Sequence, residues 1–62
     1  VWDLVRGLPP RERLAIALRY AGGFTESEVA QAMGVAVGTA SATLASARRR
    51  LASMLAEEDD HA

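Results

Sequence analysis

The stretch "FTESEVAQAMGVAVGTA", residues 24–40, decides how the chain folds. Thr25 is followed three residues later by Glu28, and this is the spacing of a capping box. In a capping box, a hydroxyl and a carboxylate reciprocally satisfy open backbone donors at the start of a helix. The pattern predicts a helix over residues 25–33 that ends at Gly34, because glycine commonly follows the last helical residue. The side chains expected to turn inward are Val29, Ala30 and Met33.

A long helix is predicted to begin three residues after Gly34 and to cover residues 37–56. Apolar residues recur there at intervals of three and four, which gives one narrow seam for packing. The seam residues are Val37, Ala40, Leu44, Ala47, Leu51 and Met54. Two helices joined by a short glycine-containing turn form the helix-turn-helix pattern. This pattern occurs both in DNA-binding domains and in purely structural bundles, so both interpretations stay open.

Two more helices are predicted upstream. Residues 1–7 would form a short one, and residues 10–21 a longer one that begins at Pro10, where a missing N–H is harmless. A Gly-Gly pair directly after the second helix then stops it. Its buried stripe is expected to consist of Leu14, Ala17, Leu18 and Ala21. The predicted fold is therefore an all-α, four-helix domain over residues 1–56, with a C-terminal helix-turn-helix and a long recognition helix.

Length and composition indicate one small domain. The chain has 62 residues, no cysteine and a net charge of −1, so no bulk positive field draws it onto a phosphate backbone. No apolar run approaches the ~20 residues that span a bilayer, and we expect no membrane partner. Residues 57–62 form an acidic tail that we expect to be disordered, because negative charge is unfavourable at a helix C-terminus. Since the chain begins with Val1 and not with methionine, we interpret it as a fragment of a longer protein.

Catalysis is not expected. The one histidine, His61, lies next to the end of the chain, and no Ser/His/Asp or Cys/His arrangement surrounds it in the sequence. We interpret Glu12, Glu26 and Glu28 as helix-surface or capping residues. The sequence contains no metal-ligand cluster and no phosphate-cradling glycine loop. We therefore predict that the chain is not an enzyme and holds neither a metal nor a cofactor.

The last helix is the candidate DNA reader. In a DNA-binding helix-turn-helix, the second helix enters the major groove and its N-terminal residues contact base edges. Residues 37–46 would take that place, with hydroxyls that bond several bases but discriminate poorly, and methyl groups that suit thymine. The hydroxyls belong to Thr39, Ser41, Thr43 and Ser46, and the methyl groups to Ala42 and Ala45. No Arg, Lys, Asn or Gln stands there to make a bidentate base contact.

Three arginines follow about three turns into the same helix. Arg49 should lie on the outward face with Arg50 beside it, while Arg48 leans toward the seam, where its stem could cover apolar surface. Phosphate contact, which positions a protein without specifying a sequence, is one interpretation. A solvated helix end whose cations complement the helix dipole is the other, and both stay open. Arg11 and Arg13, at a helix start, could also touch a DNA backbone.

The segments "LPPRERLAIALRY" (residues 8–20) and "FTESEVAQAMGVAVGTASATLASARRRL" (residues 24–51) resemble region four, the C-terminal DNA-binding region, of bacterial sigma factors of the sigma-70 family. The extracytoplasmic-function group looks most similar. The likeness covers about residues 8–55, and its most specific pieces are "LPPRER…LRY" and "EVAQAMGVAVGTA". LuxR-type regulatory domains share the "PRER" start, but they generally differ in the second helix of the motif and lack the "LRY…GG-F-T" link.

The resemblance implies a four-helix domain whose last helix docks at the upstream (minus thirty-five) promoter element. It also implies contact with the flap of the RNA polymerase β subunit and, often, capture by an anti-sigma factor. Ahead of this chain, the parent protein would be expected to carry region two, which melts the promoter. Such a protein would act in the cytoplasm.

The chain departs from the family where the family contacts DNA. Sigma factors typically place basic residues at the positions of Ser41 and Thr43, and often an arginine at that of Ser46. Ala42 stands where the family usually has a serine, and Ala40 replaces a larger aliphatic residue on the seam. Each lost phosphate contact removes close to one counterion equivalent from the salt-dependent part of affinity, so DNA binding should be strongly weakened. When the DNA-contacting positions of the family are transferred to this sequence one by one, the residues that can still make their contacts are Thr25, Thr39 and Arg49.

Two functions are consistent with these observations. The first is sequence-specific binding of the upstream promoter element in transcription initiation, as part of RNA polymerase holoenzyme. Its predicted DNA-contacting residues are Thr25, Thr39, Ser41, Ala42, Thr43, Ser46, Arg49 and Arg50. The alternative is a sigma-like interaction module with weakened DNA contact, which binds the polymerase flap, another part of its own chain or an anti-sigma factor. The small neutral side chains on the last helix favour it, because they let another helix approach closely.

Overall fold

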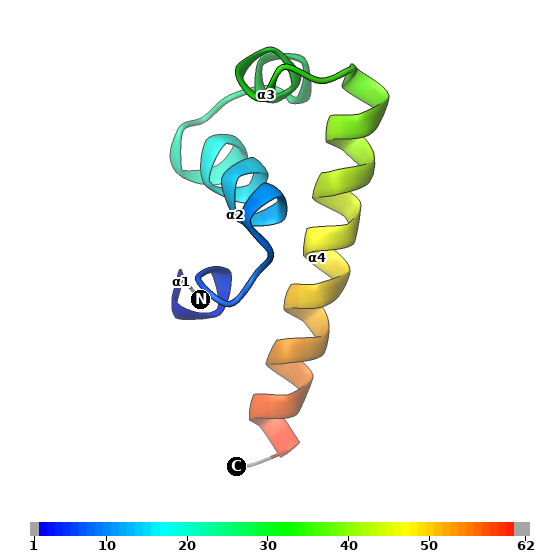
Figure 1. Cartoon of the computed structure of the whole chain (residues 1–62). Helices are drawn as coiled ribbons and strands as arrows, with labels where there is room; N and C mark the ends of the chain where they lie inside the picture. The colour runs from blue at the N-terminus through cyan, green and yellow to red at the C-terminus, as the bar shows by residue number, and fades with distance from the viewer. Residues whose placement is uncertain (1, 61–62) are drawn as a thin grey trace.

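The computed structural model describes the backbone of residues 2–60 and the side chains of residues 2–57. Its helical segments are α1 (Trp2–Val5), α2 (Pro10–Ile16), η1 (Ala17–Ala21), α3 (Glu26–Met33) and α4 (Val37–Asp60). Because η1 continues α2 without a break, these segments form four helices, and no strand occurs in the described residues. The predicted all-α, four-helix fold is confirmed. Figure 1 shows α4 running the length of the molecule, with α1, α2 and α3 placed one after another along one side.

The first two helices differ in detail from their predicted ranges. The helix expected over residues 1–7 ends at Val5, and the chain then turns, with the Gly7 N–H donating to the Leu4 carbonyl at 3.0 Å. The helix predicted over residues 10–21 has the expected extent, but its last five residues, η1, form a π-helix. Its closing bond runs from the Gly22 N–H to the carbonyl of residue 17 at 3.0 Å. A π-turn of this kind widens the helix locally.

The buried face of the helix formed by α2 and η1 differs in part from the predicted one. Leu14 is 48% exposed and Ala21 is exposed, while the side chains that face the core are those of Glu12, Ala15 and Ile16. These three residues lie at helical spacings of three and four and therefore share one face. The apolar pattern could not reveal this face because one of its members is a carboxylate. The predicted stripe was wrong for Leu14 and Ala21, whereas Leu18 packs against the core as predicted and Ala17 is half-buried.

The start and end of α3 confirm the local prediction. The Thr25 N–H donates to Glu28 Oε1 at 2.9 Å, and Thr25 Oγ1 accepts from the Glu28 N–H at 3.2 Å. The hydrogen bond from the Thr25 backbone, together with the Thr25 side chain, holds the pKa of the Glu28 carboxyl below its ordinary value. At the other end, Gly34 has a φ of 71°, in the left-handed region that glycine adopts easily. The predicted core residues Val29 and Ala30 are buried, and Met33 packs against them.

The seam of α4 forms the other half of the core. Ala40, Leu44 and Ala47 are completely buried, and Leu51 and Met54 are partly buried against the same cluster. Val37 is the exception. It is the first residue of α4 and is 49% exposed.

The C-terminal end of α4 lies later than predicted. The helix continues to Asp60, four residues past the expected end at 56, so the prediction of disorder is wrong for residues 57–60. Glutamate has a high intrinsic helix propensity, and the helix-dipole penalty for an exposed charge is only about 0.3–1 kcal/mol. Residues 61 and 62 lie outside the described residues.

Within residues 2–60, no single helix is long and apolar enough to cross a membrane, although α3 and residues 37–57 of α4, taken together as a bent pair, meet the criteria of length and composition. The bend between these two helices is 103°. Val29, Ala30, Ala40, Leu44 and Ala47 of these helices are buried in the domain core, whereas Val37 and Leu55 are exposed.

Two open glycine positions allow a matched test of the turn between α3 and α4. A Cβ added at Gly34 or at Gly38 would meet no atom within 4 Å, but only Gly34 has a positive φ. We expect Gly34→Ala to lower the free energy of unfolding by about 1 kcal/mol, because the left-handed region disfavours a side chain. Gly38→Ala should raise it by about 0.5–1 kcal/mol, because alanine is the better residue inside a helix. Urea unfolding of the two variants measures the difference, and equal effects of the same sign would contradict the turn geometry.

Candidate nucleic-acid interface

The helix-turn-helix consists of α3, a turn over residues 34–36, and α4. The two helices meet at 103°, which lies within the range of about 90–120° typical of this motif. In Figure 1, α3 crosses one end of the molecule and the first turns of α4 stand beside it. Gly38, Thr39 and Ala42 are exposed on these turns. The motif therefore has a geometry in which the exposed first turns of α4 could enter the major groove of DNA.

The hydroxyl groups predicted to contact DNA are only partly available. Ser41, Thr43 and Ser46 are half-buried. The Ser41 hydroxyl donates to Oε1 of Glu26, at the start of α3. The Thr43 hydroxyl donates to the backbone carbonyl of Thr39 at 2.8 Å. Both groups can therefore still accept a hydrogen bond from outside, but each has committed its only hydrogen.

Thr25, which was also predicted to contact DNA, stabilises the start of α3. It is the N-cap residue of α3, and its Oγ1 accepts the N–H of Glu28. Its side chain is exposed, and it lies on the helix that crosses the DNA backbone in the usual docking of this motif. Thr25 thus caps α3 directly before Glu26, which accepts a hydrogen bond from Ser41 of α4.

Arg50 takes part in an interaction that neither interpretation of the arginines included. Its Nε lies 3.0 Å from Oε1 and 3.4 Å from Oε2 of Glu12, which projects from α2. The Glu12 side chain is 12% exposed and the Arg50 side chain 52% exposed. The pair therefore ties α2 to α4, while the outer part of the guanidinium stays in contact with solvent.

Sequence reasoning missed Glu12 as a partner. Its signal lay in spacing, since it stands three and four residues before Ala15 and Ile16 and shares their face. An acidic residue at a core-facing helix position needs a cation, because a buried charge without a partner is costly.

Arg49 is exposed on the outward face of α4, as predicted. Among the described side chains, none forms a hydrogen bond or an ion pair with it. It lines a hollow of about 730 Å³ together with Ser46, Arg50 and Ser53. Arg49 is therefore the cation on this helix that is most available to an external phosphate.

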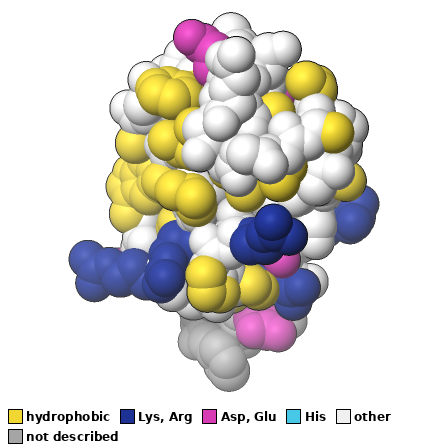
Figure 2. Space-filling view, turned by 45° about the horizontal axis from the view of Figure 1, so that its top comes forward, with side chains coloured by type: hydrophobic (Ala, Val, Ile, Leu, Met, Phe, Trp, Pro, Cys, Tyr) yellow, Lys and Arg dark blue, Asp and Glu magenta, His cyan; other side chains and the backbone are white. Residues whose placement is uncertain are grey.

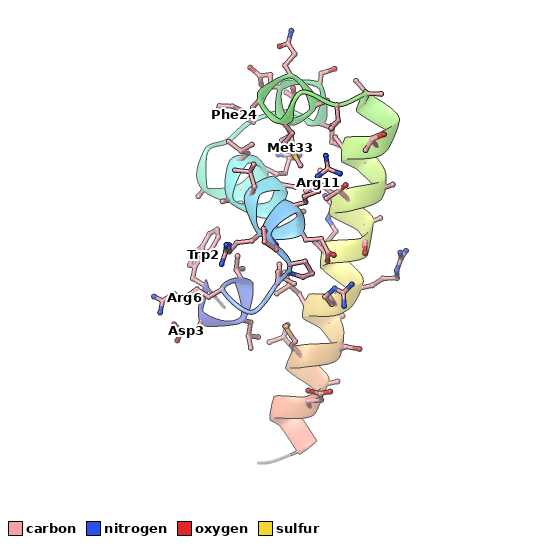
Figure 3. All side chains as sticks on the ribbon, viewed as in Figure 1. Trp2, Asp3, Arg6, Arg11, Phe24 and Met33 are labelled. Carbon is pink, nitrogen blue, oxygen red and sulfur yellow. The ribbon has the colours of Figure 1, made fainter. Side chains whose placement is uncertain are left out.

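A second hollow, of about 450 Å³, adjoins the first and shares Pro9 and Ser46 with it. We call the two together the polar groove, which runs between residues 7–12 and α4. Its charged and hydroxyl-bearing lining residues are Arg11, Glu12, Thr43, Ser46, Arg49, Arg50, Ser53 and Glu57. Figure 3 shows Arg11 projecting from the start of α2 into the space beside α4. Arg11 thus joins the candidate site.

Charge is unevenly distributed around this interface. In Figure 2, the Arg side chains gather in the lower half of the face shown, and the upper half carries mostly uncharged side chains. The first two turns of α4 contribute no cation to the described surface, in agreement with the neutral residues of that stretch. Of the seven arginines, Arg11, Arg49 and Arg50 line the polar groove, and the base-facing turns of α4 carry no charged side chain.

Arg48 lies on a different side of α4, toward the apolar surface, as predicted. Its Nε donates to the Tyr20 hydroxyl at 2.7 Å, and its guanidinium lies 5.7 Å from the centre of the Tyr20 ring. This pair borders a hollow of about 290 Å³, which we call the apolar groove. The groove is lined by Trp2, Val5, Ile16, Tyr20, Arg48, Leu51, Ala52 and Leu55. Trp2, Tyr20 and Leu55 are between 41% and 52% exposed there, so the groove is open to a partner.

No group of three or more His, Asp or Glu side chains in the described part of the chain is placed to hold a metal ion. The ionisable side chains of the interface are engaged in ion pairs and caps or face solvent. The chemistry that the arrangement supports is binding by hydrogen bonds, by charge and by apolar contact.

Comparison with known proteins identifies one family. Residues 1–51 match the family model described as "Sigma-70, region 4". The match covers α3, the turn and α4 as far as residue 51, and with them all eight residues predicted to contact DNA. Searches among curated proteins and among solved structures found no match.

Proposed function

Because the chain belongs to the sigma-70 region 4 family, we propose that it recognises the upstream (minus thirty-five) promoter element as part of RNA polymerase holoenzyme. The family gives the chain a DNA-binding role in transcription initiation and an interaction with RNA polymerase. The recognition of this particular element, the extracytoplasmic-function type and a cytoplasmic site of action are parts of the proposal.

The observation that carries the proposal is the polar groove beside α4. It places Arg11, Arg49 and Arg50 along one side of the helix whose first turns would enter the major groove. Cations beside an inserted helix can hold the phosphate backbone and so fix its register on the duplex. Ala42, exposed in the second turn, can contact a thymine methyl group.

We expect this chain to bind DNA more weakly than is usual for members of its family. Arg50 is partly neutralised by Glu12, and the first two turns of α4 supply no cation. Since phosphate contacts provide most of the salt-dependent affinity for DNA, a domain with two or three of them binds far more weakly than one with six or more.

A comparison of two neighbouring arginines tests the DNA role. Arg49→Ala removes the most available cation of the polar groove, and we expect the salt dependence of log K to become shallower by about 0.9. Arg48→Ala removes the same charge from the side that faces the apolar groove and should leave this slope unchanged. Fluorescence anisotropy with an upstream promoter duplex, titrated with salt, measures both. If Arg49→Ala had no effect, or if the two variants lost binding equally, the assignment of the polar groove to DNA would be wrong.

The apolar groove supports a second candidate function, which is protein binding. Three large exposed side chains, Trp2, Tyr20 and Leu55, surround it, and such a patch commonly marks an interaction site. We propose that it receives an apolar segment of RNA polymerase, in the flap of the β subunit. An anti-sigma factor and another part of the parent chain are the competing occupants. Leu55→Asp should abolish binding of a β-flap fragment and leave DNA affinity unchanged. Unchanged flap binding by this variant would reject the groove as that site.

A further inference from the structure

The α3 side of the recognition helix is bordered by a carboxylate. Glu26 is the first residue of α3 and is half-buried, and it accepts a hydrogen bond from the Ser41 hydroxyl in the second turn of α4. This bond joins the two helices of the helix-turn-helix motif at the end where α4 is exposed. The pair therefore stands at the edge of the surface that would face the bases.

The bond fixes the hydrogen-bonding character of both side chains. A serine hydroxyl has one hydrogen, which Ser41 gives to Glu26, so only its lone pairs remain for an outside partner. An ionised glutamate can only accept. The exposed residues that neighbour Ser41 on the helix surface, Val37 and Gly38 one turn earlier, have no polar side-chain atom. This edge of α4 thus presents acceptors and no donor from its side chains.

Resting on the proposed function, we propose that the Glu26–Ser41 pair is a base-reading element that accepts hydrogen bonds. It would favour a base with an exocyclic amino group on the DNA strand beside α3, that is, cytosine or adenine. In the major groove, cytosine offers its N4 amino group and adenine its N6 amino group, whereas guanine offers only the acceptors N7 and O6. A glutamate that accepts from cytosine N4 is one of the side-chain pairings that this geometry allows.

The charge of Glu26 makes this selectivity costly in affinity. A carboxylate close to the duplex is repelled by the phosphates of every sequence. It is repelled further where the base in front of it presents an acceptor. Specificity that is built from such a repulsive element lowers affinity for all duplexes, and lowers it most for the wrong ones.

Two charge-matched variants test the inference. Glu26→Gln keeps the size of the side chain, but its amide can donate to Ser41 and release the serine hydrogen toward a base. Glu28→Gln removes the same charge two residues along α3 and still supports the capping box. Affinities of the whole chain would be measured at low salt for a set of duplexes, each with one base pair of the promoter element replaced.

We expect the wild-type chain to prefer cytosine or adenine over guanine at one position by about threefold to tenfold, the effect of one net hydrogen bond. Glu26→Gln should reduce this ratio to below about twofold and raise the affinity for all duplexes. Glu28→Gln should retain the wild-type ratio. Ser41→Ala, which removes only the hydroxyl, offers a second test if Glu26→Gln is poorly folded, and it should lower the ratio as well.

Two outcomes would overturn the inference while DNA binding itself stands. One is a Glu26→Gln or Ser41→Ala chain with an unchanged base preference. The other is a wild-type preference for guanine at the position that Glu26→Gln alters. If the wild-type chain binds no duplex at low salt, the proposed function fails and this inference fails with it.

Discussion

A chain with Ser41, Thr43 and Ser46 all replaced by arginine is expected to bind an upstream promoter duplex about a hundredfold more tightly than the wild type near ~0.1 M salt. Each added phosphate contact contributes close to 0.9 to the slope of log K against log salt, so three contacts would steepen it by about 2.7. The change in slope should be slightly smaller than about 2.7, because an arginine at position 41 would face the carboxylate of Glu26 and could contact the phosphates less well. Salt-titrated fluorescence anisotropy measures both quantities.

The control for this prediction places the same number of arginines elsewhere. Ala21, Ala52 and Ala56 are exposed and do not line the polar groove. Their replacement by arginine changes the net charge equally, and we expect less than a tenth of the gain in affinity. If both triple variants gained equally, the effect would be one of net charge alone, and the neutral residues of α4 would not explain weak binding.

The largest expected loss of stability is that of Leu44→Ala. Leu44 is completely buried at the centre of the α4 seam, where it packs in the core formed by α2, α3 and α4. Truncation should lower the free energy of unfolding by about 3 kcal/mol, from the lost apolar burial and the cavity left behind. Because a domain of this size is stable by only about 5 kcal/mol, the variant would retain about 2 kcal/mol, and its midpoint of thermal unfolding should fall by about 12–24 °C.

Leu55→Ala is the matched control for this loss. Leu55 lies on the same helix but is 41% exposed, so its truncation should cost less than about 1 kcal/mol. Urea unfolding followed by circular dichroism compares the two variants. A loss for Leu44→Ala no larger than that for Leu55→Ala would contradict the position of the core.

The parts of the fold that depend on neighbouring residues were predictable. The cap at Thr25, the stop at Gly34 and the seam through Leu44 each follow from residue types at fixed short spacings. The stripe of α2 was not predictable in this way, because a polar residue, Glu12, occupies a core position and is satisfied by Arg50, far along the chain. The end of α4 was predicted too early. The unfavourable interaction of acidic residues with the helix dipole was considered, but the high helix propensity of glutamate was not.

The residue types of the candidate site could be predicted from the sequence, but the contacts between its side chains could not. The sequence correctly indicated neutral first turns on α4 and an outward Arg49. It could not show that Ser41 donates to Glu26, since that contact depends on how α3 crosses α4. Nor could it bring Arg11 to the polar groove, because that position depends on the packing of α2 against α4.

The central claim is that this region 4 domain binds promoter DNA through few phosphate contacts. The most direct test is the slope of log K against log salt for the wild-type chain on an upstream promoter duplex, from about 20 to about 200 mM salt. With Arg11, Arg49 and a partly neutralised Arg50 as the cations of the polar groove, we predict binding at the lowest salt and a slope between about −1.8 and −2.7. A slope of about −5 or steeper, or no binding at about 20 mM salt, would contradict the claim.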